Sequence, residues 1–268
     1  MLLWNTHNPF RSCLVFDDGY CILWDYQDSN HYVESNYLYI DEVRTGASMF
    51  YFAKGDKVKS AAENFSDQVG QAFKKKGKHS KRLAIDKIML DGFKSLENRD
   101  FKIENGEKIM EHARSIKSSE EIKAMRCSIS ACETSMHIME NKTKPGMTEN
   151  DIWSILHSEN IKRGGEWIET RLLSSGTKTN PWFQECGSRV LQNNEIVAFD
   201  TDLVGCYSIC TDISRTWWIG DQEPTNEMKQ DYRIALDHIQ QNAELVAPGI
   251  HFSCLLYTSP SPRDFQVS

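Results

Sequence analysis

The chain has 268 residues, of which 40% are hydrophobic and 26% are charged, and its formal net charge is -7. This composition predicts a globular protein of one large or two modest domains and excludes the collagen-like, disordered and disulfide-knot classes. No run of about 18 apolar residues occurs, which excludes a membrane span, and the acidic balance argues against nucleic acid as a partner.

The cysteines give a further expectation about the compartment. The first residues, MLLWNTHNPF, lack the basic segment and the long apolar core of a secretory signal. We therefore expect the eight scattered cysteines to be reduced thiols of a cytoplasmic protein. Cys206 and Cys210 have a C-x3-C spacing, but no second cysteine or histidine pair completes a zinc set.

The first part of the chain alternates between strand and helix patterns. Two apolar runs within residues 12–25 flank Asp18-Gly19, a dipeptide typical of a hairpin turn. Further elements are expected as strands at 48–53 and 82–90 and as helices at 57–73 and 91–99. This alternation predicts a small α/β domain.

Capping signals then predict two helices in succession. The first begins at Ser118 or Ser119, with Glu121 as a capping partner, and runs to about residue 141. The second begins at Thr148, with Asp151 as its partner, and ends near residue 163. A strand-rich stretch follows over residues 165–221, and a long helix is expected over residues 224–246.

Three aspartates mark the strand-rich stretch. Asp200 and Asp202 are two residues apart on a predicted strand and so share one face, and a hairpin joined at Gly205 brings Asp212 back beside them. Gathered carboxylates repel one another, and a divalent cation would offset that repulsion. Oxygen ligands suit Mg, Mn, Fe(II) or a paired-metal site. Alternatively, some of these aspartates cap turns or pair with Arg215.

Four segments of the chain resemble the pita-bread superfamily of methionine aminopeptidases, prolidases and creatinases. They are DTDLVGCYSICTDISRT, the helix openings SSEEIKAMRCS and MTENDIWSIL, and APGIHFS. The resemblance covers roughly residues 112–253 and implies an α/β (α+β) fold. It implies a creatinase-like N-terminal domain over residues 1–113 and an incomplete pita-bread catalytic domain over residues 114–253. Residues 254–268 are expected to be read-through of a sequencing adapter, because CLLYTSPSPRD looks like the translation of one.

That superfamily holds one or two metals with two aspartates, a histidine and two glutamates, and Asp212 matches the second aspartate. The usual first aspartate would fall at Thr201, which Asp200 and Asp202 flank. A substrate-contacting histidine of many peptidase members is replaced by Trp182. Both departures resemble the metal-dependent dimethylsulfoniopropionate lyases of the DddP type, which form dimethyl sulfide and acrylate.

The lyase branch implies a small-molecule substrate, a homodimer and a divalent metal, iron in the first place, with manganese, cobalt or zinc as alternatives. Asp200, Asp202 and Asp212 are the expected metal ligands. Trp4 and Trp182 are the expected aromatic contacts of the sulfonium group, since an aromatic face attracts cations. Each of these tryptophans could equally be a core residue, as could Trp217 and Trp218.

Two alternatives stay open: an Xaa-Pro aminopeptidase or dipeptidase of the same fold, and a non-enzymatic binding protein on the same scaffold. After Asp212 the only histidines are His238 and His251, which fit a helix surface and a loop. The remaining metal ligands and the catalytic base cannot be assigned. The chain as given is therefore expected to bind metal weakly and to be catalytically inactive.

Overall fold

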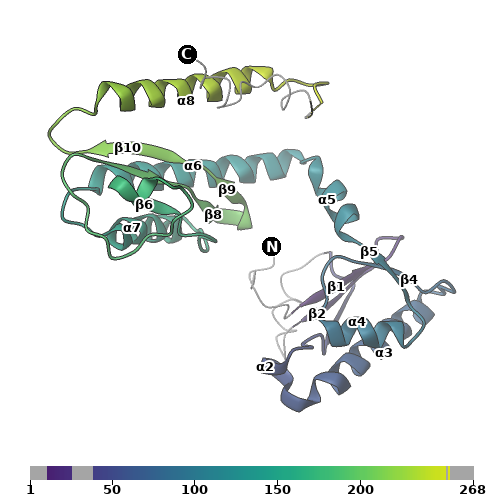
Figure 1. Ribbon diagram of the computed structural model, residues 1–268. Helices are drawn as coiled ribbons and strands as arrows, with labels where there is room; N and C mark the ends of the chain where they lie inside the picture. Colours follow the sequence, from purple (N-terminus) through teal and green to yellow (C-terminus); the bar gives the residue numbers. More distant parts are fainter. Residues whose placement is uncertain (1–10, 26–38, 252, 254–268) are drawn as a thin grey trace. The chain divides into compact units, whose positions relative to one another are not determined.

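The computed structural model describes residues 11–25, 39–251 and 253, and the chain divides into two compact units, Met1–Lys123 and Ala124–Ser268 (Figure 1). Each unit is considered by itself. The domain boundary expected after residue 113 remains a prediction.

The first unit contains two small sheets with helices. Strands β1 (Ser12–Val15) and β2 (Cys21–Asp25) form the predicted antiparallel hairpin, and β3 (Glu42–Thr45) pairs parallel to β2. Strands β4 (Arg82–Ile85) and β5 (Lys102–Asn105) form a parallel pair. The helices are α2 (Tyr51–Lys54), α3 (Val58–Lys75), α4 (Leu90–Glu97) and α5 (Glu107–Ser115).

Helix α3 confirms the helix expected at 57–73 and supplies much of this unit's core. Its buried apolar residues are Ala62, Phe65, Val69, Ala72 and Phe73, and Phe65 meets the Trp24 ring of β2 edge-on at 5.1 Å between centroids. Their spacing of three or four residues places these side chains on one side of the helix, and that side packs into the core.

The strand expected at 48–53 is wrong. Residues 48–50 are irregular and α2 follows at once. Met49 and Phe50 are buried in the core, whereas Tyr51 and Phe52 are 70% and 86% exposed. The apolar run is therefore divided between core and solvent by the turn into a helix, and such short runs have no periodicity that distinguishes strand from helix. Likewise, the strand expected at 82–90 ends at Ile85.

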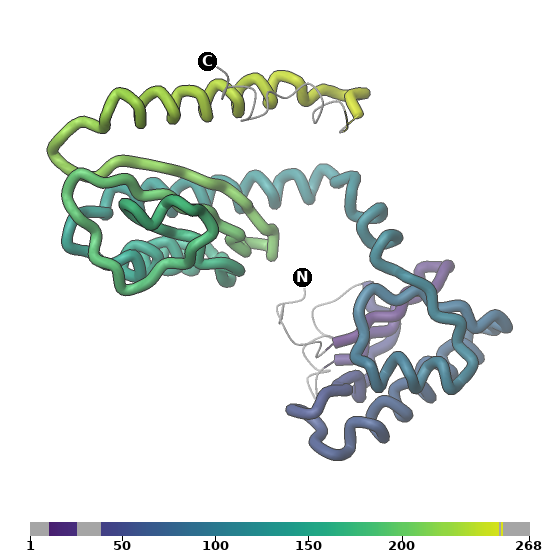
Figure 2. The backbone as a smooth tube through the Cα atoms, viewed as in Figure 1, coloured from purple at the N-terminus to yellow at the C-terminus, as the bar shows by residue number. Residues whose placement is uncertain are grey.

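The second unit packs two helices against antiparallel strands. Helices α6 (Ser119–Lys142) and α7 (Glu149–Lys162) confirm the two expected helices. A three-stranded sheet has the order β10 (Arg215–Ile219), β7 (Glu195–Phe199), β6 (Leu173–Ser175), and β8 (Asp202–Val204) pairs with β9 (Cys210–Asp212). Figure 2 traces the backbone through these elements, with the strands in green.

The predicted caps position both helices. Ser118 Oγ accepts from the Glu121 amide at 3.3 Å, and Glu121 Oε2 accepts from the Ser118 amide at 2.7 Å. Thr148 and Asp151 form the same reciprocal pair at 3.1 and 2.8 Å. Each box satisfies two amides that the first helical turn leaves without partners.

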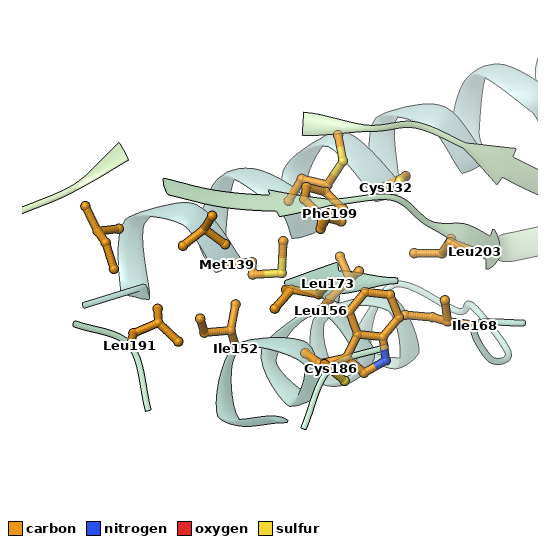
Figure 3. Close-up of a cluster of buried hydrophobic side chains, with 14 residues drawn as sticks. Cys132, Met139, Ile152, Leu156, Ile168, Leu173, Cys186, Leu191, Phe199 and Leu203 are labelled. Carbon is orange, nitrogen blue, oxygen red and sulfur yellow. The ribbon is translucent and has the colours of Figure 1, made fainter. Parts of the chain in front are cut away.

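The core of the second unit lies between these helices and the sheet. Figure 3 shows Met139 of α6, Ile152 and Leu156 of α7, and Leu173 and Phe199 of β6 and β7 meeting in one cluster. Ile152, Leu156 and Leu173 are fully buried. This packing fixes β7 and the residues that follow it, which carry the aspartates.

Helix α8 (Asn226–Leu245) confirms the long helix expected at 224–246, but none of its residues is buried in the part of the chain that the structure describes. Its apolar members Tyr232 and Ile239 are 55% and 66% exposed. Within the described ranges, no helix is both long and apolar enough to cross a bilayer.

Candidate metal centre

The three predicted aspartates lie on one continuous hairpin. Asp202 pairs directly with Asp212 across β8 and β9, and the same register continues to Phe199 opposite Arg215 in β7 and β10. Asp200 therefore stands opposite Ser214, whose hydroxyl donates to Asp200 Oδ1 at 2.7 Å. Since alternate residues of a strand share a face, Asp200, Asp202 and Asp212 lie on the same face. The predicted hairpin is confirmed, with its turn at residues 206–208.

The carboxylates repel one another. The pKa of the Asp212 carboxyl is raised above its ordinary value by partial burial, by the charges of Asp200 and Asp202, and by a side-chain hydrogen bond with Asp200. Within the described residues, none of the three has a salt-bridge partner. Arg215, the alternative partner considered from the sequence, instead donates to the backbone oxygen of Ser214 at 2.8 Å.

Hydroxyl groups hold the outer aspartates in place. Thr170 Oγ1 donates to Asp202 Oδ2 at 3.0 Å, and Ser214 does the same for Asp200. Asp200 Oδ1 also accepts from the Thr201 amide at 3.1 Å.

These donors fit part of a metal ligand set. Carboxylate oxygens are hard ligands, and mutual repulsion is the condition that a divalent cation relieves. Across residues 11–25, 39–251 and 253, however, no group of three or more His, Cys, Asp or Glu side chains is arranged to hold a metal ion. The hairpin thus offers candidate ligands and does not by itself form a complete site among these residues.

Thr201 occupies the position between the two aspartates and points to the opposite face. Its side chain is fully buried, and its hydroxyl has no hydrogen-bond partner among the described residues. This hydroxyl faces the protein interior, whereas the flanking aspartates lie on the other face of the strand.

Trp182 lies on an irregular segment between β6 and β7, just after the cis Asn180–Pro181 bond. Its side chain is 36% exposed, and its neighbour Phe183 is 79% exposed. Trp4 lies outside the described residues. Trp217 packs edge-on against Phe199 at 5.5 Å between centroids, and the Trp218 indole donates to the Gln222 carbonyl, so both have structural contacts.

One residue that the sequence did not single out organises the Trp182 segment. Glu149, the first residue of α7, is fully buried, and its carboxylate accepts from Ser175, Lys178 and Gly187. In the sequence, Glu149 is one more acidic residue in a helix's first turn, where acidic residues are common. No local signal distinguishes it.

His238 and His251 lie apart from the aspartate hairpin in the sequence. His238 is half-buried on α8, and the His251 ring interacts with Ser253 Oγ at 2.8 Å. Neither belongs to a metal-binding group of described side chains.

Comparison with known proteins accounts for this arrangement. The model of metallopeptidase family M24 matches residues 123–256, which is half of the chain. The chain belongs to metallopeptidase family M24. The predicted superfamily and its mixed α and β fold are thereby confirmed, and membership of the M24 family implies a divalent metal.

Solved structures of M24-like fold agree. The chain superimposes on an X-Pro aminopeptidase from Thermotoga maritima with a TM-score of 0.69 and 20% identity, covering 89% of this chain and 62% of that one. A prolidase from Pyrococcus horikoshii gives a TM-score of 0.70 and 16% identity, with 88% and 62% covered. At these identities the likeness concerns the fold.

Two curated relatives are much more similar in sequence. Proteins called dimethylsulfoniopropionate lyase DddP, from Roseobacter denitrificans and Roseovarius nubinhibens, are 53% and 52% identical over 255 residues. The alignments cover 93% of this chain and 57% of each relative, so the chain spans little more than half of their length.

Proposed function

We propose that this M24 chain carries the metal-binding hairpin and a substrate-contacting segment of a lyase that cleaves dimethylsulfoniopropionate to dimethyl sulfide and acrylate. The observation that carries the proposal is the 53% identity to a dimethylsulfoniopropionate lyase over 93% of this chain. The peptidases of the same fold are at or below 20% identity in the two comparisons above, which favours the lyase over an Xaa-Pro peptidase.

Asp200, Asp202 and Asp212 are the proposed ligands of a divalent metal. When bound, such a cation supplies positive charge that stabilises negative charge on and beside a substrate carboxylate. We propose iron as this metal, with manganese, cobalt and zinc as alternatives. The Thr170 and Ser214 hydroxyls orient the first two carboxylates toward it through the bonds given above.

Trp182 is the proposed contact for the sulfonium end of the substrate. An indole face attracts a cation that has no hydrogen to donate, whereas a histidine at this position would offer a proton donor instead. The reaction removes the proton next to the carboxylate, forms a carbon–carbon double bond and breaks the carbon–sulfur bond, and sulfur leaves with the electron pair. The aromatic face thus serves a group whose positive charge disappears in the reaction.

We also propose a homodimer in the cytoplasm, with domains at residues 1–113 and 114–253. Support for the compartment comes from the scattered spacing of the cysteines in the sequence, which predicts reduced thiols. The homodimer is supported by family resemblance. Light scattering coupled to size exclusion tests it, and a monomer mass would contradict it.

The experiment on function uses the polypeptide encoded by the complete gene, read beyond the codon for Ser253. The purified protein is loaded separately with Fe(II), Mn(II), Co(II) and Zn(II) and given either dimethylsulfoniopropionate or an Xaa-Pro dipeptide. Dimethyl sulfide in the headspace supports the proposal. Release of free amino acid instead supports the peptidase. If the protein binds a substrate but forms neither product, the result supports a binding protein.

A further inference from the structure

A single buried carboxylate joins the two ends of the segment that carries Trp182. Ser175 precedes this segment, residues 176–187, and its amide and hydroxyl both donate to Glu149 Oε1, at 2.9 and 2.8 Å. Gly187 closes the segment, and its amide donates to Glu149 Oε2 at 3.1 Å. Both ends are therefore held by the same side chain.

The segment is also held from within. Lys178 Nζ donates to Glu149 Oε2 at 2.7 Å and to the Glu185 carbonyl at 2.6 Å. The Gln184 amide group donates to the carbonyls of Lys178 and Pro181 at 3.1 and 2.9 Å. Trp182 and Phe183 lie between these bonded residues.

The N-terminus of α7 adds backbone bonds to the same frame. The amides of Glu149 and Asn150 donate to the carbonyls of Arg189 and Gly187, each at 3.0 Å. Glu149 starts the helix, is fully buried and accepts four hydrogen bonds. A buried charge is tolerated only when it is paired and hydrogen-bonded, so the loss of any of these bonds is costly. The Glu149 carboxylate is therefore a rigid attachment point.

We propose that Glu149 is the positioning residue of the 176–187 segment and thereby sets the orientation of Trp182 toward the substrate. The link to the substrate rests on the function proposed above. The link between Glu149 and the segment rests only on the bonds just described.

Replacement of Glu149 by glutamine tests the proposal because no orientation of the amide fits. Each carboxylate oxygen accepts from two donors, so the amide nitrogen meets either the two Ser175 donors or Lys178 and the Gly187 amide. The matched control is Glu159→Gln on the same helix. Glu159 is 5% exposed and pairs with Lys162 and Arg163, away from this segment.

The first readout is hydrogen exchange by mass spectrometry on the chain itself. Glu149→Gln should speed exchange in the 175–187 peptide about ten- to a hundredfold, with peptides of α6 and β7 unchanged, and Glu159→Gln should leave this peptide as in the wild type. If Glu149→Gln does not fold, Lys178→Gln replaces it, since it removes one donor and should release the same peptide to a smaller extent.

The second readout is kinetic and uses the polypeptide from the complete gene. Glu149→Gln should raise KM for dimethylsulfoniopropionate about tenfold with kcat changed less than threefold, and Glu159→Gln should change neither. Equal exchange in all variants, or uniformly faster exchange throughout the unit, overturns the positioning role. Faster local exchange with unchanged KM in an active enzyme overturns the link to substrate.

A wild-type protein without lyase activity overturns the proposed function, and with it the substrate link. The exchange measurement still decides separately whether Glu149 positions the segment. The two failures are therefore distinguishable.

Discussion

Asp202 and Asp212 stand directly opposite each other across the β8–β9 hairpin. Like charges opposite each other on one face of a sheet are destabilising unless something offsets them. Desolvation raises the pKa of the Asp212 carboxyl, and the charges of Asp200 and Asp202 raise it further. If the proposed metal binds here, it offsets this repulsion, and this gives a prediction whose sign depends on the metal.

In the polypeptide from the complete gene, replacing Asp212 by asparagine should stabilise the protein without metal and destabilise it with metal. In chelator, the neutral amide removes the repulsion and the midpoint of thermal unfolding should rise. With Mn(II) present, the wild type gains binding free energy that the variant lacks, and the order should reverse. Differential scanning fluorimetry measures both. Asp231→Asn on the exposed face of α8 is the control, and a difference that keeps one sign in both conditions would contradict the metal site.

Trp182→Ala should weaken substrate binding in the polypeptide from the complete gene. A contact between a cation and an aromatic ring contributes about 0.5–2 kcal/mol, so KM for dimethylsulfoniopropionate should rise roughly 2- to 30-fold. Trp182→Phe keeps an aromatic face and should have a smaller effect. Phe183→Ala, at the more exposed neighbour, is the control. Equal increases in KM for Trp182→Ala and Phe183→Ala would contradict the proposed contact of Trp182 with the substrate.

The Glu42 carboxylate should contribute to the free energy of unfolding of the first unit at neutral pH and lose this contribution in acid. Hydrogen bonds from Arg44 and Lys75 lower the pKa of the Glu42 carboxyl from 4.5 to about 2, against the opposing effect of burial. A lowered pKa means that the unfolded chain takes up the proton first as the pH falls. The stabilisation is therefore fully present above pH 4.5 and is lost as the pH falls through about 2.

Glu42→Gln removes that dependence. The wild type should exceed the variant by on the order of 1–2 kcal/mol at pH 6, a figure reduced for solvent screening, and the two should converge near pH 2. Urea unfolding at several pH values measures the difference. If the wild type and the variant differ in free energy of unfolding by the same amount at pH 6 and at pH 2, the pairing of the carboxylate does not cause the difference.

Truncation to alanine at two positions of α7 should lower the free energy of unfolding by very different amounts. Leu156 is fully buried in the core of Figure 3, whereas Ile161 is 58% exposed. Leu156→Ala should lower the free energy of unfolding by about 2–5 kcal/mol, because a cavity is left in a packed core. Ile161→Ala should cost less than about 1 kcal/mol. Denaturant titration of both variants checks the packing, and similar costs would contradict it.

The buried threonines of the hairpin offer a matched pair. Thr201 has no partner for its hydroxyl among the described residues, whereas Thr211 Oγ1 donates to the Leu203 carbonyl at 3.4 Å. Thr201→Val should be neutral or stabilising by up to about 1 kcal/mol, and Thr211→Val should be destabilising by about 1 kcal/mol. Thermal unfolding in chelator measures both. A loss at Thr201 as large as at Thr211 would indicate a partner for the Thr201 hydroxyl.

Local signals in the sequence determined the elements whose physics is local. Helices α3, α6, α7 and α8 begin and end within two residues of the expected ranges, because apolar spacing and capping residues are local signals. The aspartate hairpin was predictable for a similar reason, since period two and a turn at Gly205 place Asp200, Asp202 and Asp212 together.

Other features depended on contacts between residues distant in the chain. The run 48–53 carries no periodicity, so only the core decided that Phe50 packs while Phe52 meets solvent. Arg215 was close enough in sequence to pair with an aspartate, but its strand directs it to the Ser214 carbonyl instead.

Glu149 shows the limit most clearly. Its partners Ser175, Lys178 and Gly187 lie 26, 29 and 38 residues further along the chain, and no spacing rule connects them to the start of a helix. The sequence by itself determined the long helices, the hairpin and the shared face of the aspartates, because short-range geometry sets them. Only the tertiary structure decided which carboxylate is buried and what it holds, because burial and pairing depend on the packing of the whole unit.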